Sequence, residues 1–190
     1  MDTFDTVRKS RKAVGASTDE EQDLLRASLV FACAGLDSMI KQLIRDALPT
    51  VIDKHPGSHL MLQQHVERVL KNSPTFGVEI MAEIIVSQEP RVLLIDRLIG
   101  DLTSGSVQSA EEVMRIGAYF DIPSKDIVTD IPGLKAVFGA RNQIVHEMDV
   151  DFKQVNRNRR PRTKSRMTEY TNEVFKVASA FLAEVGSRAK

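Results

Sequence analysis

Apolar residues at helical spacing constrain the fold of this 190-residue chain more than any other feature. They recur every three or four positions at Leu24, Leu25, Leu29, Val30, Cys33, Leu36, Met39, Ile40, Leu43, Ile44 and Ala47, which predicts a long amphipathic helix. Ser17 and Thr18 each stand three residues before a glutamate, a pattern typical of a helix start. Because the residue before a proline disfavours helical backbone, Pro49 predicts that this helix ends at Leu48.

The rest of the chain also has the pattern of helices. They are expected over about 58–70, 90–102 and 109–120, from Ile131 onward and from Thr168 onward. VEIMAEIIV (residues 78–86) is short enough for a buried strand, but Glu79 and Glu83 lie four residues apart, which favours helix. We therefore predict an all-α, single-domain bundle of six to seven helices over 17–190, with a long first helix and a basic N-terminal arm at 1–16.

Composition is that of an ordinary soluble globular protein, with 42% apolar and 27% charged residues. No uninterrupted apolar run approaches the roughly 18 residues of a membrane span, and the first 16 residues lack the apolar core of a signal peptide. The single cysteine, Cys33, excludes an internal disulfide, and its apolar neighbours predict that it is buried. These features predict a cytoplasmic protein without a membrane partner.

Charge is unevenly distributed, although the formal net charge is zero. The segment 153–166 contains seven basic and no acidic residues, which leaves 19 basic residues against 26 acidic ones elsewhere. Its basic residues are Lys153, Arg157, Arg159, Arg160, Arg162, Lys164 and Arg166. Such a segment is either a surface that faces a polyanion or a solvated loop, and charge alone does not separate the two.

The stretch ARNQIVHEMDV, residues 140–150, carries the chemistry of greatest interest. On a helix, Asn142 and His146 share a face, and the long side chain of Arg141 can fold towards His146. Ile144 and Val145 are expected to point inward. Arginine binds phosphate oxygens with two donors, and histidine exchanges protons near neutral pH. The set therefore suits phosphodiester chemistry without a metal, whereas a surface pair or a helix-end contact is the structural alternative.

RNQIVH resembles the signature motif of HEPN domains, in which an arginine and a polar residue precede a histidine. In that family the motif lies late in a small all-α domain, before a final helix, as it does here. LDSMIKQLIRDALP in the first helix is similar, more loosely, to the RiboL-PSP type of HEPN domain.

This resemblance implies a metal-independent endoribonuclease that acts as a homodimer, in which the 2′-hydroxyl of RNA attacks the adjacent phosphate. Arg141 would bind the phosphate, His146 would act as acid, base or 2′-hydroxyl ligand, and Asn142 would assist, with Asp37 as a supporting acidic residue. No cofactor or metal is expected. HEPN domains occur in toxin–antitoxin pairs, CRISPR effectors and phage defence, which implies an antitoxin or defence-system partner.

RNA binding is assigned to the basic loop at 153–166, through Arg157, Arg159, Arg160, Arg162, Lys164 and Arg166. A second interpretation is a non-catalytic helical module that binds nucleic acid or an acidic protein. A third is a nucleotide-binding regulatory subunit. Ribonuclease activity in EDTA distinguishes the first interpretation from the other two.

Overall fold

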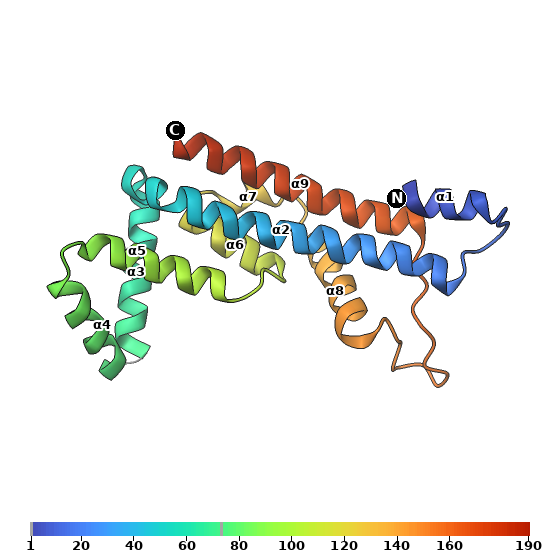
Figure 1. The fold of residues 1–190 in the computed structure, drawn as a ribbon, viewed down its shortest axis with the longest axis horizontal. Helices are drawn as coiled ribbons and strands as arrows, with labels where there is room; N and C mark the ends of the chain where they lie inside the picture. Colours follow the sequence, from blue (N-terminus) through green and yellow to red (C-terminus); the bar gives the residue numbers. More distant parts are fainter. Residues whose placement is uncertain (1, 73) are drawn as a thin grey trace. The chain divides into compact units, whose positions relative to one another are not determined.

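The computed structural model describes residues 2–72 and 74–190, and this part of the chain is helical (Figure 1). Its nine helices are α1 (Asp2–Ser10), α2 (Asp19–Lys54), α3 (Pro56–Asn72), α4 (Pro74–Val86), α5 (Pro90–Ser104), α6 (Ala110–Tyr119), α7 (Ser124–Ile127), α8 (Ile131–Glu147) and α9 (Lys164–Ala189). An isolated antiparallel bridge joins Val150 to Arg159. The predicted all-α class is confirmed. The count exceeds the prediction by α1 and α7, which are too short to show a clear apolar period.

The described helices form two compact units. The predicted single domain over 17–190 stays a prediction. The first unit contains residues up to Ser38, 108–110 and 128–179, and so includes α1, α8 and the basic loop. The second contains 39–107, 111–127 and 180–190, and includes α3, α4, α5 and α7. Because α2 and α9 each contribute to both units, the division does not follow chain order.

The start of α2 was predicted correctly, but its end was not. Thr18 and Glu21 form a reciprocal capping box: the Glu21 amide donates to Thr18 Oγ1 (3.3 Å) and the Thr18 amide donates to Glu21 Oε2 (3.1 Å). The helix continues through Pro49 to Lys54. A proline inside a helix costs about 3 kcal/mol. Burial of Leu48, Val51 and Ile52 offsets this cost.

The burial pattern of α2 is that of a helix with one apolar face. Its buried apolar residues up to Pro49 are Leu25, Leu29, Cys33, Leu36, Ile40, Ile44, Ala47 and Leu48, which follow the predicted period. By length and composition, α2 is also the one described helix that could cross a membrane. The sequence-based argument against a span did not anticipate this helix. Because core helices of soluble proteins meet the same criterion, localisation stays a prediction.

The last helix, α9, begins at Lys164, four residues before the predicted start at Thr168. Thr163 caps it: the Arg166 amide donates to Thr163 Oγ1 (3.3 Å), and the Met167 amide donates to the Thr163 carbonyl (3.0 Å). In the second unit, the ring of Phe181 on α9 packs edge-on against Phe120, with centroids 5.8 Å apart. Of the predicted RNA-binding residues, Arg162 lies in the loop, whereas Lys164 and Arg166 lie in the first turn of α9.

Candidate functional site

Helix α8 holds the RNQIVH motif in its second half. The helix begins with Asp130, whose Oδ1 accepts a hydrogen bond from the Gly133 amide (2.9 Å), and Pro132 stands in its first turn. Leu134, Val137, Phe138 and Ala140 are buried, so this face packs on the core of the first unit. The buried first half of α8 thereby fixes the orientation of the motif in its second half.

One detail of the predicted packing is wrong, because Val145 is 40% exposed rather than inward-facing, and Ile144 is only half-buried. Met148 and Phe152 are also exposed, by 71% and 61%. The end of α8 and the loop after it therefore present large apolar side chains to solvent beside the motif. Exposed apolar side chains mark an interaction surface where they form one contiguous patch.

The arginine, asparagine and histidine of the motif lie together. Arg141 Nη1 donates hydrogen bonds to Asn142 Oδ1 (3.0 Å) and to Gln108 Oε1 (3.1 Å), and lies 3.5 Å from His146 Nε2. Arg141 is half-buried and His146 is exposed. Because Arg141 has only donors, the facing His146 Nε2 is the acceptor of the long contact. Asn142 orients the guanidinium rather than the imidazole.

The motif faces α2 near Cys33. Arg141 acts electrostatically on Cys33, which is 3% exposed. Burial raises the pKa of the Cys33 thiol to about 11, and Arg141 opposes this rise, so the thiol stays protonated at neutral pH. Asp37 lies one turn further along α2 and is half-buried. Its supporting role stays a prediction.

The end of α8, which carries His146, is held by an unusual turn. Met148 and Asp149 both have left-handed backbone, with φ of +52° and +60°. This conformation lets the Asp149 amide donate to the Gln143 carbonyl (2.9 Å), closing the last turn of the helix. Left-handed backbone is uncommon for residues other than glycine. Interactions elsewhere must therefore hold Asp149 in place.

Those interactions come from two arginines that enclose the Asp149 carboxylate. Arg26 Nε donates to Oδ2 (2.8 Å), while Arg162 donates from Nε to Oδ2 (2.9 Å) and from Nη2 to Oδ1 (2.5 Å). The side chains of Asp149, Arg26 and Arg162 are 0%, 3% and 10% exposed. This cluster, the Asp149 clamp, ties the end of α8 to α2 and to the basic loop.

The charge of the Asp149 clamp depends on its two arginines. Burial alone would raise the pKa of Asp149, but the hydrogen bonds and positive charges of Arg162 and Arg26 lower it below its ordinary value. Asp149 is therefore ionised at neutral pH. The sequence alone did not single it out, because its partners are 123 positions before it and 13 after it.

Most of the predicted RNA-binding side chains also form ion pairs within the fold. Besides the Arg162 pair, they are Arg159–Asp23 (2.6 Å), Arg160–Glu147 (2.9 Å), Lys164–Asp5 (2.5 Å) and Arg166–Glu169 (3.1 Å). Arg157 is exposed and has no ion pair within the described part of the chain, and the same holds for the Lys153 side chain. The loop is thus ordered by acidic partners, and two of its cations stand out as available to a ligand.

Metal ligands do not cluster at this site. Over 2–72 and 74–190, no group of three or more histidine, cysteine, aspartate or glutamate residues is placed to hold an ion. Comparison with protein-family models, with curated proteins and with solved structures found no match for the chain. Inference about its function therefore depends on the chemistry of Arg141, Asn142 and His146 themselves.

Proposed function

We propose that this protein is an endoribonuclease of the HEPN type, which cleaves RNA by attack of a 2′-hydroxyl on the neighbouring phosphate. The observation that carries the proposal is the 3.5 Å approach of Arg141 Nη1 to His146 Nε2 at an accessible helix end. A permanent cation then lies beside an imidazole, a group that can act as acid or base.

Each side chain has a role that its contacts support. Arg141 binds the non-bridging phosphate oxygens and stabilises the extra negative charge of the transition state. His146 removes the proton of the 2′-hydroxyl or delivers one to the leaving oxygen. Asn142 and Gln108 hold the Arg141 guanidinium through their side-chain oxygens, which reduces the entropy that it would lose on binding phosphate. Asp149 positions the helix end and does not contact the reacting atoms.

The proposed nucleophile, the 2′-hydroxyl, restricts the substrate of cleavage to RNA. RNA should be cleaved in EDTA, and DNA of the same sequence should bind but resist cleavage, because DNA lacks the 2′-hydroxyl. The measurement is gel analysis of end-labelled RNA and DNA with the purified protein, in EDTA and in Mg²⁺. Equal cleavage of DNA, or a strict requirement for Mg²⁺, would replace this proposal with a two-metal mechanism.

We also propose that the active form is a homodimer, joined through the exposed apolar residues Val145, Met148 and Phe152. A two-fold axis near these residues would place both copies of Arg141 and His146 close together, because a two-fold interface pairs the same surface on both subunits. Sedimentation at micromolar concentration measures the association. A strictly monomeric protein that cleaves RNA at its full rate would contradict a composite site.

The basic loop is proposed to bind the RNA backbone through its two unpaired cations. Replacing Lys153 and Arg157 together by alanine should weaken RNA binding and reduce the log–log salt slope by about 1.4, since each phosphate contact with a single strand accounts for about 0.7. Turnover at saturating RNA should stay near wild type. Binding titrations over a series of salt concentrations measure both quantities.

The matched control for the loop is Lys176→Ala, which removes an exposed cation from α9 whose ion pair with Glu173 is 3.4 Å long. It should leave the salt slope unchanged. Neutralising Arg159, Arg160 or Arg162 is a poor test of binding, because each loss breaks an ion pair within the fold. Wild-type affinity and slope in the double variant would assign the loop to a protein partner, in agreement with a non-catalytic module.

A further inference from the structure

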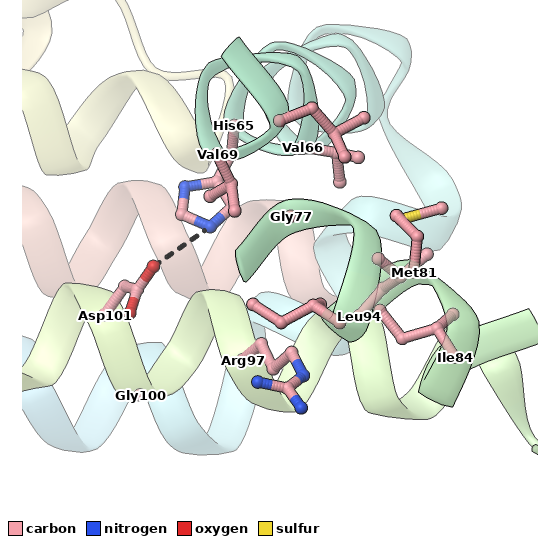
Figure 2. Close-up of a pocket in the computed structure, with 12 residues that line it drawn as sticks. His65, Val66, Val69, Gly77, Met81, Ile84, Leu94, Arg97, Gly100 and Asp101 are labelled. Atoms are coloured by element: carbon pink, nitrogen blue, oxygen red, sulfur yellow. Dashed lines mark ion pairs between the residues drawn. The ribbon is translucent and has the colours of Figure 1, made fainter. Parts of the chain in front are cut away.

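The second unit contains a pocket of about 320 Å³ between α3, α4 and α5 (Figure 2). Its wall is aliphatic, with contributions from Val66, Val69, Ile80, Met81, Ile84 and Leu94. The volume lies at the lower end of the range for small-molecule sites, which runs from roughly 300 to 1,000 Å³. A small ligand with an apolar body therefore fits this space.

Two glycines shape the pocket. Gly77 brings α4 close to α3, since a Cβ atom there would lie only 3.1 Å from the Leu70 Cα atom. Gly100 on α5 lines the pocket, and a Cβ atom there would meet no atom within 4 Å. The backbone of α5 is thus uncovered at Gly100, and a larger side chain at this position has room to fill the pocket.

One end of the pocket is closed by His65 on α3, which is 5% exposed and faces Asp101 on α5 (Figure 2). Arg68 Nη2 lies 2.9 Å from His65 Nδ1, and His65 Nε2 lies 3.2 Å from Asp101 Oδ2. Because arginine can only donate, Nδ1 must be the acceptor, and the ring proton is on Nε2, where it is donated to Asp101. His65 is therefore a neutral imidazole in this arrangement.

The pKa of His65 agrees with this assignment. Burial lowers it below its ordinary value; the Asp101 carboxylate acts in the opposite direction, and Arg68 adds to the lowering. The neutral form consequently dominates at pH 7. Asp101 thus has an uncharged hydrogen-bond donor as its partner rather than a cation.

The charges of the side chains that line the pocket are therefore unbalanced. Arg97, the other charged residue that lines it, forms an ion pair with Glu83. Asp101 has no cationic partner within the described residues, and its side chain is 64% exposed. Asp101 is thus the one charged lining residue without an ion-pair partner of opposite charge, and it lies beside the aliphatic wall.

We propose that this pocket binds a small aliphatic primary amine. The ammonium group contacts the Asp101 carboxylate, and the hydrocarbon chain lies against Val69, Met81 and Leu94. An aliphatic carboxylate fits the wall equally well but meets the charge of Asp101 unfavourably. This inference is independent of the proposed RNA cleavage, since every residue that it uses belongs to the second unit.

The test compares three probes that share a hexyl chain: hexylamine, hexanol and hexanoate, each titrated into the full-length protein at pH 7 by calorimetry. Hexylamine should bind about two- to fivefold more tightly than hexanol, since Asp101 is largely exposed, and hexanoate should bind most weakly. In Asp101→Asn, which keeps an acceptor for His65 and removes the charge, hexylamine and hexanol should bind equally.

A filled pocket provides the second arm. Gly100→Leu should abolish binding of all three probes, because the leucine side chain would fill the pocket. The variant should fold, because leucine favours helical backbone more than glycine does. Gly186→Leu is the matched control, because Gly186 is an exposed helical glycine of the same unit outside the pocket. Tighter binding of hexanoate than of hexylamine, unchanged binding in Gly100→Leu, or no saturation by any probe at millimolar concentration would overturn the proposal.

Discussion

Asp149→Asn should lower the free energy of unfolding by about 3–5 kcal/mol, which is the typical loss when one partner of a buried ion pair is removed. The substitution leaves Arg26 and Arg162 buried without a negative charge. Asparagine is the right replacement, because it tolerates the left-handed backbone that Asp149 adopts, whereas alanine would add strain. The thermal midpoint should fall by roughly 6–20 °C, measured by calorimetry or circular dichroism.

Glu169→Ala is the control, since it removes an ion pair with Arg166 in which both side chains are more than half exposed. Its effect should stay below about 1 kcal/mol. Equal stabilities of Asp149→Asn and wild type would mean that the Asp149 clamp does not hold the end of α8. The clamp would then not position His146.

The Asp149 clamp should also make stability depend on acid pH. The folded-state pKa of Asp149 is lowered, so its contribution to stability is complete above the unfolded-state pKa. The contribution is lost as the pH falls through the folded-state pKa, because the proton then binds the unfolded chain more readily than the folded one. This window lies below the ordinary pKa of aspartate, well away from pH 7.

His146→Ala should reduce turnover of RNA by about 10²–10⁴-fold, as expected for the loss of a proton-transfer group. This corresponds to about 3–5.5 kcal/mol of transition-state stabilisation. The thermal midpoint should stay near wild type, because His146 is exposed and its described contact, with Arg141, is 3.5 Å long. Single-turnover cleavage and thermal unfolding, measured on the same preparation, check both expectations.

His59→Ala is the matched control for His146→Ala, since it removes an exposed histidine of α3 that lies outside the motif. It should keep the chemical step at saturating RNA within a few-fold of wild type. If His146→Ala unfolds instead, His146 is a structural residue at the helix end, and the proposal of proton transfer fails.

Local patterns in the sequence predicted much of the fold. The apolar period of α2 and the Thr18–Glu21 capping box depend on residues within one or two turns, and both agree with the structure. The proximity of Arg141 to His146 is likewise a consequence of their spacing on one helix. Contacts between residues within one or two helical turns can be predicted because the sequence spacing sets which side chains meet.

Tertiary contacts overruled the local rules elsewhere. Pro49 should end α2, but the buried residues on both sides of it keep the helix intact. The basic loop has the composition of a free cationic surface, yet Arg159 pairs with Asp23, 136 positions away. The Asp149 clamp was missed for the same reason, because it joins Arg26 to a carboxylate 123 positions later.

The central claim is tested most directly by the ends of the RNA fragments. Purified wild-type protein, incubated with labelled RNA in EDTA, should leave 2′,3′-cyclic phosphates, because the attacking 2′-hydroxyl stays bonded to the phosphorus. The Arg141→Ala, His146→Ala double variant, purified in the same way, should leave the RNA intact. Equal cleavage by the two proteins would contradict the account, since the activity would then come from a contaminant or from residues other than Arg141 and His146.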